Sequence, residues 1–179
     1  MPRDRCGSFS AILCVMELAA VLLTNSPIGL LAIGATEQGL AEIKILTADD
    51  RRAEFICGQR AAEHADRTAE QLAEYFSKKR SRFELTFDLA GTAFQKSVWL
   101  ELAKLQLGEA TSYGELASRI GKPAAARAVG GAVGSNPIPL AIGCHRVLGS
   151  GGLLTGYSGG GGLATKRWLL DFEGIEYRR

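Results

Sequence analysis

The chain has 179 residues, of which 46% are hydrophobic and 22% charged, and its formal net charge is +2. This composition is typical of a globular protein and argues against both an intrinsically disordered chain and a membrane protein. The length suffices for one large or two small domains, with a core that needs neither disulfides nor metal.

The charge is distributed unevenly along the chain. Residues 1–91 contain 11 basic and 13 acidic side chains, whereas residues 92–179 contain 10 basic and 6 acidic ones. The second half is therefore the basic half, with a net charge of +4 against −2 in the first. A basic surface there suits a polyanionic partner.

Four cysteines are widely spaced, at Cys6, Cys14, Cys57 and Cys144, and the sequence holds only two histidines. There is no Cys-x-x-Cys motif, so the spacing predicts neither a zinc site nor a disulfide framework. We expect reduced thiols, no metal and no other cofactor, in a cytoplasmic protein that is associated with the nucleoid if it is bacterial.

The N-terminal segment imitates a signal peptide, because Arg3 and Arg5 precede an apolar run over residues 11–23. Glu17 interrupts that run and no convincing small-x-small cleavage site follows it, which argues against secretion. Met16 leads directly into the first predicted strand. One hypothesis is therefore that Met16 is the natural start and residues 1–15 are an extension.

The first half of the chain predicts a small sheet followed by a helix. Three short apolar runs between residues 18 and 46 are separated by turn residues, a pattern typical of a three-stranded meander. Apolar residues then recur at three- and four-residue spacing over 49–79, which predicts an amphipathic helix that contains Cys57 as a structural thiol. Alternation over 83–89 predicts a final strand or an extended linker, and we expect the domain boundary within 77–91.

The second half predicts three helices. Thr92 is a suitable N-cap for the first of them. Ser112 and Glu115 have the spacing of a capping box for a second helix over 112–120. A third helix, rich in alanine and glycine, runs over 124–133. Two short helices joined by a tight glycine-containing turn indicate a helix-turn-helix.

Arg127 is the one charged side chain in the third predicted helix, close to its N-terminal end. Its small neighbours, Ala126 among them, would let that helix approach another surface closely. DNA is one such surface, but the same composition is also compatible with tight helix packing, because many helix-turn-helix units bind no DNA.

Cys144 and His145 stand side by side between a turn with two prolines and a glycine-rich segment over 149–162. A cysteine reacts as thiolate, and at an ordinary pKa of about 8.5 it is mostly protonated at neutral pH, so it needs a base. Side chains at consecutive positions seldom face each other, so we expect His145 to accept the proton through one water molecule. This framing favours a reactive cysteine over a structural one.

Five short motifs follow one another between residues 136 and 174. They are Asn136-Pro137-Ile138-Pro139, Cys144-His145-Arg146-Val147, Gly156-Tyr157-Ser158-Gly159-Gly160, Lys166-Arg167-Trp168-Leu169-Leu170 and Glu173-Gly174. In order and spacing they resemble the active-site half of the O6-alkylguanine-DNA alkyltransferases. Ser26-Pro27-Ile28-Gly29 is a weaker match in the first half.

The resemblance implies an α+β fold. A small N-terminal ribonuclease H-like domain of sheet plus helix is expected over residues 16–85, and a mainly helical, winged-helix-like domain with the helix-turn-helix over residues 86–179. The implied partner is double-stranded DNA that carries O6-alkylguanine. We expect a monomer with no obligate protein partner and no contact with a membrane.

By the same resemblance, Cys144 takes the alkyl group from O6 of guanine, or from O4 of thymine, in one irreversible transfer after the base has been flipped out of the duplex. His145 is the implied base and Glu173 its orienting acid. Tyr113 donates a proton to the guanine ring nitrogen as charge develops there. Asn136 ties the proline turn to the active-site loop.

The resemblance also implies how DNA is bound. Arg127 takes the place of the extruded base, in a helix that enters the minor groove. Ala126, Val133 and Tyr113 accompany it at the DNA surface. The residues expected to line the pocket for the flipped base are Val147, Tyr157, Ser158 and Gly159.

Two features depart from the family pattern. Gly143 stands before the cysteine, where the family usually has proline, which predicts a less stable but competent loop. Two extra glycines before Leu163 lengthen the binding loop. Two alternatives remain open at this point: a non-catalytic lesion-binding protein of the alkyltransferase-like kind, and a cysteine hydrolase with a Cys144 and His145 dyad, which would turn over repeatedly.

Overall fold

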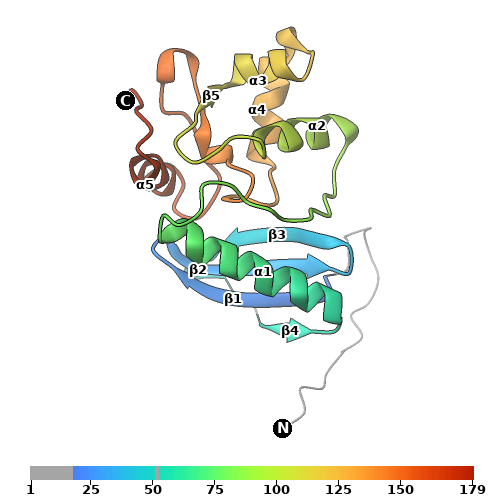
Figure 1. Cartoon of the computed structure of the whole chain (residues 1–179). Helices are drawn as coiled ribbons and strands as arrows, with labels where there is room; N and C mark the ends of the chain where they lie inside the picture. The colour runs from blue at the N-terminus through green and yellow to red at the C-terminus, as the bar shows by residue number, and fades with distance from the viewer. Residues whose placement is uncertain (1–17, 51–52) are drawn as a thin grey trace.

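A computed structural model of the chain describes residues 18–50 and 53–179. The first part of the chain forms a sheet with one long helix, and the second part forms a group of shorter helices that lies against the β3 edge of that sheet (Figure 1). The expected extension over 1–15 and the start at Met16 lie outside the described residues.

The sheet has four antiparallel strands in the order β3-β2-β1-β4. The strands are β1 (Ala20–Ser26), β2 (Gly29–Thr36), β3 (Gly39–Ile45) and β4 (Phe55–Ile56). The predicted three-stranded meander is confirmed. Gly29, at a φ of 114°, allows the tight turn between β1 and β2, where the Ser26 hydroxyl donates to the Gly29 carbonyl over 2.6 Å.

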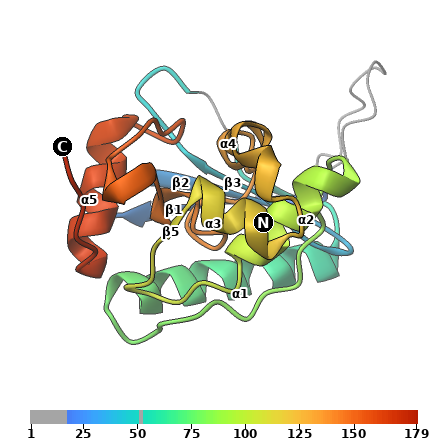
Figure 2. The ribbon, with the colours of Figure 1, turned by 90° about the horizontal axis from the view of Figure 1, so that it is seen from above.

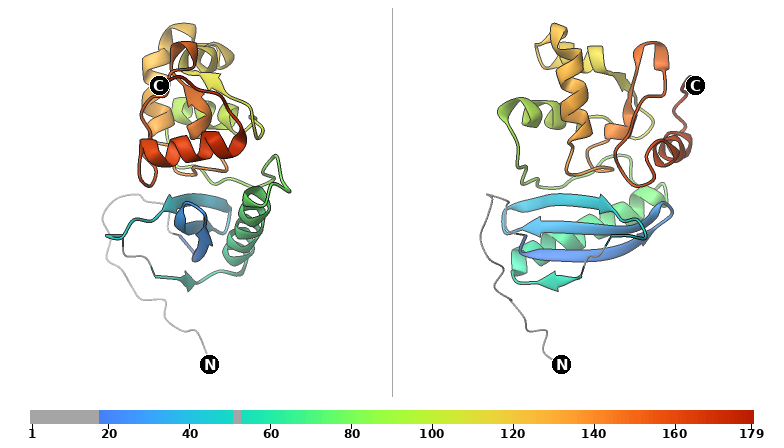
Figure 3. Two further views of the ribbon diagram at one scale, coloured as in Figure 1. Left: turned by 90° about the vertical axis from the view of Figure 1, so that its left-hand side faces the viewer. Right: turned by 180° about the vertical axis from the view of Figure 1, so that it is seen from behind.

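One face of the sheet is covered by α1 (Gln59–Phe76) (Figure 3). The predicted start of this helix at residue 49 is wrong, because Phe55 and Ile56 pair with β1 as an edge strand. Cys57 therefore lies before the helix and is exposed, and its backbone N–H donates to Ala19. A sequence window could not show this pairing, since β1 lies some thirty residues upstream.

The segment after α1 is extended, as predicted. Its β-bridge to the sheet joins Leu40 and Phe87, and the backbone of Glu84 is hydrogen-bonded to the side chain of Gln71 in α1. Leu40 donates to Thr86 and accepts from Asp88. The segment therefore crosses the edge of the sheet at β3 before the second group of helices begins.

The second part contains four α-helices and one short parallel strand pair. The helices are α2 (Ala93–Leu102), α3 (Tyr113–Arg119), α4 (Ala126–Gly134) and α5 (Leu163–Glu173). The pair is β5 (Thr111–Ser112) with β6 (Val147–Leu148), and the 3-10 turns are η1 (Pro123–Ala125), η2 (Cys144–Arg146) and η3 (Ser150–Gly152). Seen from above, α3 and α4 lie between α5 and α2 (Figure 2).

The local signals at the helix starts are confirmed. Thr92 and Gln95 form a capping box at α2, and Ser112 and Glu115 form one at α3. The helix-turn-helix consists of α3 and α4. The α-helix α4 begins two residues later than predicted, because Pro123 starts a 3-10 turn in front of it.

One continuous apolar cluster joins the two parts. It includes Leu31 and Ile33 of the sheet, Trp99 of α2 and Ile142 of the loop before Cys144. The backbone N–H of Ile43 in β3 donates to the Pro137 carbonyl over 2.9 Å. The sheet therefore supports the proline turn from below. Within the described residues, no helix combines the length and apolar character needed to cross a membrane.

Candidate active site

Cys144 is the first residue of the η2 turn and its side chain is buried, with 7% of the residue exposed. It borders two cavities. One, of about 190 Å³, lies toward the helix-turn-helix and is also lined by Tyr113, Val133 and Ser158. The other, of about 250 Å³, lies toward β3 and is lined by Ile43, Asn136 and Tyr157 among others. The thiol can therefore be reached by a ligand of limited size.

The loop before the cysteine is fixed by Asn136. Its side-chain amide donates to the Ile142 carbonyl over 2.8 Å, and its carbonyl oxygen accepts from the Ile138 N–H over 3.0 Å. Leu140, between these partners, has a φ of 74° and is fully buried. Such a backbone conformation costs a non-glycine residue roughly 1–3 kcal/mol, so the surrounding contacts must hold it.

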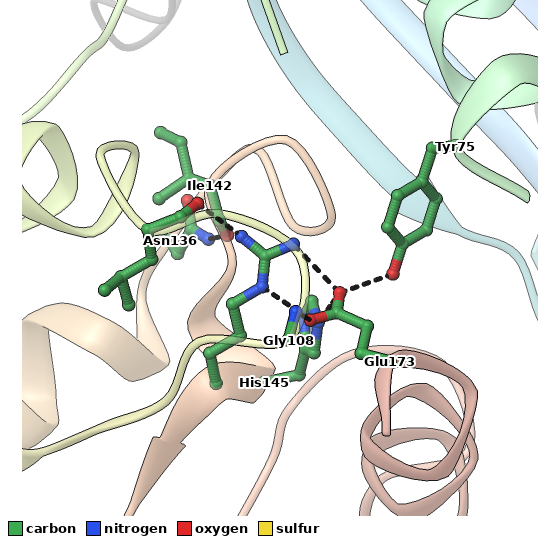
Figure 4. A network of polar contacts seen from close by, with 8 residues as sticks. Tyr75, Gly108, Asn136, Ile142, His145 and Glu173 are labelled. Atoms are coloured by element: carbon green, nitrogen blue, oxygen red, sulfur yellow. Dashed lines mark hydrogen bonds and ion pairs between the residues drawn. The ribbon is translucent and has the colours of Figure 1, made fainter. Parts of the chain in front are cut away.

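The His145 side chain points toward α5. Its Nε2 lies 2.8 Å from Oε1 of Glu173, and neither side chain has any exposure to solvent (Figure 4). A carboxylate only accepts, so Nε2 carries the proton and Nδ1 is the unprotonated nitrogen of the neutral ring. Nδ1 is buried and has no hydrogen-bond partner among the described residues. Glu173 thus orients the ring, and Nδ1 remains available to accept a proton.

Arg146 completes this group. Its Nε lies 2.8 Å from Oε2 of Glu173, its Nη2 lies 2.9 Å from Oε1, and its Nη1 donates to the Leu105 carbonyl over 2.6 Å. This two-pronged geometry is the strongest form of ion pair between arginine and a carboxylate. It neutralises the buried charge of Glu173, so His145 does not have to carry a proton.

Burial and hydrogen bonding shift the pKa values of Cys144, His145 and Glu173. Burial raises the pKa of the Cys144 thiol, while Asn136, Tyr157 and Lys166 act in the opposite direction. Burial also lowers the pKa of His145 below 6.5, although Glu173 opposes the shift. Burial alone would raise the pKa of Glu173, but its hydrogen bonds to His145 and Arg146 hold it well below 4.5. At neutral pH the site therefore holds a thiol, a neutral imidazole and a carboxylate.

Lys166 is a further buried charge beside the thiol. Its Nζ donates to the Val147 carbonyl over 2.7 Å, and burial lowers its pKa to about 8. The carbonyl of Val147, a residue that the resemblance places in the pocket for the flipped base, thus already accepts one hydrogen bond. Arg146 and Lys166 stand in the recognisable motifs, but no local pattern indicated that their side chains are buried around the site.

Tyr113 is the first residue of α3, and its ring lies along one wall of the smaller cavity. Its hydroxyl is 3.2 Å from Oγ1 of Thr155. Ser158 lies in the glycine-rich loop and donates to the Gly134 carbonyl at the end of α4 over 3.0 Å. The loop and the helix-turn-helix are thereby joined at the mouth of the cavity that contains the thiol.

The residues expected at the DNA surface separate into two groups. Arg127 is exposed in the first turn of α4, and Ala126 beside it is half-buried. Val133, at the other end of α4, is buried and lines the smaller cavity. Val133 thus lies beside the thiol, whereas Arg127 faces solvent.

Gly143 and the extended glycine loop, the two departures from the family pattern, both lie in close contact with neighbouring side chains. The φ of −67° at Gly143 is the value that proline fixes, but a Cβ there would lie 2.8 Å from Cδ of Arg146. In the extended loop, Gly160 has a φ of 51° and approaches Ile45 of β3 so closely that a Cβ would lie 2.9 Å from its Cγ2. Gly159 and Gly160 both line the larger cavity.

Comparison with known proteins matches both parts of the chain. The family model described as 6-O-methylguanine DNA methyltransferase, ribonuclease-like domain, matches residues 21–89, and that of the DNA binding domain matches residues 93–175. A methylated-DNA–protein-cysteine methyltransferase of Mycolicibacterium paratuberculosis is 43% identical over 151 residues, which are 83% of this chain and 88% of that protein. One of Methanosarcina barkeri is 43% identical over 84% of this chain and 94% of its own length.

A solved structure gives the same result for the fold. The crystal structure of Mycobacterium tuberculosis OGT in complex with DNA superposes with a TM-score of 0.72 at 40% identity, and the match covers 84% of this chain and 90% of that one. The expected α+β fold is thereby confirmed. The chain belongs to the 6-O-methylguanine DNA methyltransferase family.

Proposed function

We propose that this protein repairs O6-alkylguanine, and also O4-alkylthymine, in double-stranded DNA by one irreversible transfer of the alkyl group to Cys144. The observation that carries the proposal is the position of the thiol. It borders a cavity of about 190 Å³ that Tyr113 and Val133 of the helix-turn-helix also line, while the neighbouring His145 is buried against Glu173.

The chemistry is a single displacement at the alkyl carbon. The Cys144 sulfur attacks in line, an S–C bond forms and the C–O6 bond breaks. The thiol proton passes through one water molecule to Nδ1 of His145, and Glu173 stabilises the resulting imidazolium. Tyr113 donates its hydroxyl proton to the guanine ring as negative charge develops there, and the proton taken up by His145 is returned through water to the tyrosinate, so that the thiol proton is replaced on guanine. The thioether has no hydrolytic exit, so each molecule acts once.

DNA contact is assigned to α4. Flipping a base out of the duplex costs a few kcal/mol, which contacts in the groove must offset. Arg127 is exposed at the start of α4 and its planar side chain suits stacking in the gap that the base leaves. The small side chains around Arg127, including Ala126, allow α4 to approach a narrow groove. Tyr157, Ser158 and Gly159 bound the pocket for the flipped base together with the Val147 carbonyl.

The proposal includes the organisation of the chain. Residues 16–85 act as the supporting domain and residues 86–179 as the domain that binds DNA and transfers the group, a division supported by the two family matches over 21–89 and 93–175. We place the protein in the cytoplasm as a monomer without a cofactor. Family membership sets the cysteine hydrolase hypothesis aside.

The test follows the lesion in DNA. An excess of duplex with one O6-methylguanine is incubated with the protein, and the DNA is digested to nucleosides and quantified. We expect one guanine restored per molecule of wild type and of Cys57→Ala, which removes an exposed thiol, and none with Cys144→Ala. Restoration beyond one equivalent would contradict the proposal, as would tight binding of the lesion duplex without any restoration.

A further inference from the structure

Tyr75 connects the supporting domain to the active site. It lies in the last turn of α1, and its hydroxyl donates to Oε1 of Glu173 over 2.7 Å across 98 positions of sequence (Figure 4). The residue is only 1% exposed. Burial, followed by the charge of Glu173, raises the pKa of Tyr75, so the phenol keeps its proton and acts as a donor.

The carboxylate of Glu173 is fully occupied by donors. Oε1 accepts from Tyr75, His145 and Nη2 of Arg146, and Oε2 accepts from Nε of Arg146 and from the Gly108 N–H at 3.3 Å. Tyr75 and His145 therefore share one oxygen. The strength of one bond depends on the other, because both draw on the same lone-pair density.

The Tyr75 ring has little freedom to move. Phe76 lies 5.0 Å away between ring centroids, Phe83 lies 5.5 Å away, and Phe172 of α5 packs against it at 5.4 Å in an edge-on arrangement. Aromatic contacts of this kind add to the stability gained from burial. The hydroxyl is thereby aimed at Glu173 by packing from both domains.

We propose that Tyr75 is a positioning residue of alkyl transfer: its hydroxyl holds the Glu173 carboxylate in the orientation that keeps Nδ1 of His145 unprotonated and available to the thiol. The inference rests on the proposed function. It gives the first domain, which contributes no reacting group, a direct part in the chemistry.

The hydroxyl acts by dispersing the charge of Glu173. The charged and titratable groups that act on His145 are Glu173 and Lys166 from α5, Arg146 from its own turn, and Tyr75 from α1 through Glu173. Without the hydroxyl, Oε1 is more basic and stabilises the imidazolium better. The pKa of His145 then rises. The ring therefore stays protonated up to a higher pH, and a protonated ring cannot act as a base.

The experiment compares Tyr75→Phe with Phe83→Leu. The first removes one oxygen and keeps the ring packing, while the second loosens the packing around the same ring and leaves the hydroxyl bond in place. Single-turnover methyl transfer is measured from pH 5 to 9. We expect the acid limb of the Tyr75→Phe profile to move up by about half to one pH unit, with a loss of about three- to tenfold on the acid side of the limb and little loss near pH 8.5. In the Phe83→Leu profile we expect the acid limb to stay at the pH of the wild type.

A second readout does not depend on transfer. The chain has only two histidines, so His145 can be identified in nitrogen NMR spectra by comparison with a His64→Gln variant. The free wild-type protein should show a neutral ring protonated at Nε2, and Tyr75→Phe should titrate at a higher pH. An unshifted titration, or a rate lowered equally at every pH as in Phe83→Leu, would overturn the assignment. Failure of the wild type to transfer at all would instead overturn the proposed function. The NMR titration would still test whether the Tyr75 hydroxyl lowers the pKa of His145.

Discussion

Arg146 and Glu173 form a buried two-pronged ion pair in the candidate active site, with N to O distances of 2.8 and 2.9 Å. Removing one partner of such a pair leaves an uncompensated charge in the interior, which costs about 3–5 kcal/mol. Arg146→Met should therefore lower the free energy of unfolding by that amount in a urea titration. Arg80 pairs with Glu74 at the surface, so Arg80→Met should cost less than about 1 kcal/mol. Equal losses in the two variants would contradict this account.

Gly143 accepts a hydrogen bond from the Arg146 N–H over 3.0 Å, and the Arg146 side chain fills the space where a Cβ of residue 143 would lie. In Gly143→Ala, the new Cβ meets Cδ of Arg146 at 2.8 Å, and that side chain is held by Glu173 and Leu105. We expect a loss of about 1–3 kcal/mol in stability from overpacking, together with slower transfer. A Cβ at Gly131 in α4 would meet nothing within 4 Å, so Gly131→Ala should gain about 0.5–1 kcal/mol. Thermal melts of both variants check that Gly143→Ala lowers the melting temperature and Gly131→Ala raises it.

The stability of the protein should decrease as the solution becomes acidic. The folded pKa of His145 lies below 6.5, so the unfolded chain binds more protons than the folded one once the pH falls below about that value. Glu173, whose folded pKa lies well below 4.5, adds a second loss as the pH falls below 4.5. Urea titrations from pH 7 to 5 should show the first step and their extension below pH 4 the second, and His145→Leu should remove the first. A constant free energy from pH 7 to 5 would be inconsistent with a neutral buried imidazole.

Arg127 should matter for duplex DNA and not for the transfer step itself. Loss of one base-stacking side chain costs about 1–3 kcal/mol. Arg127→Ala should therefore slow repair of a lesion within a duplex and leave transfer from the free nucleoside unchanged. Arg167 is exposed on α5, a helix that lies apart from α4 (Figure 2), and Arg167→Ala serves as a control of equal charge. Equal slowing of both substrates would indicate that Arg127 acts through the cavity instead.

Local signals predicted local structure well. Thr92 and Ser112 cap their helices as expected, because a capping box is complete within four residues. The start of α1 was mispredicted because Phe55 pairs with Val21 of β1, far away in sequence. Tyr75 carried no signal of its place beside Glu173, since only the packing of the two domains brings residues 98 positions apart together. Glu173 itself was named through the family motif, not through spacing.

The most direct test of the central claim is the intact mass of the protein after incubation with a duplex that carries one O6-methylguanine. The account predicts a gain of about fourteen mass units, one methyl group in place of a hydrogen, that maps to Cys144 and never exceeds one per chain. Cys144→Ala should gain nothing, while Cys57→Ala should behave as the wild type. An unchanged mass for the wild type after the lesion has been bound, or a methyl group on another residue, would contradict alkyl transfer to Cys144.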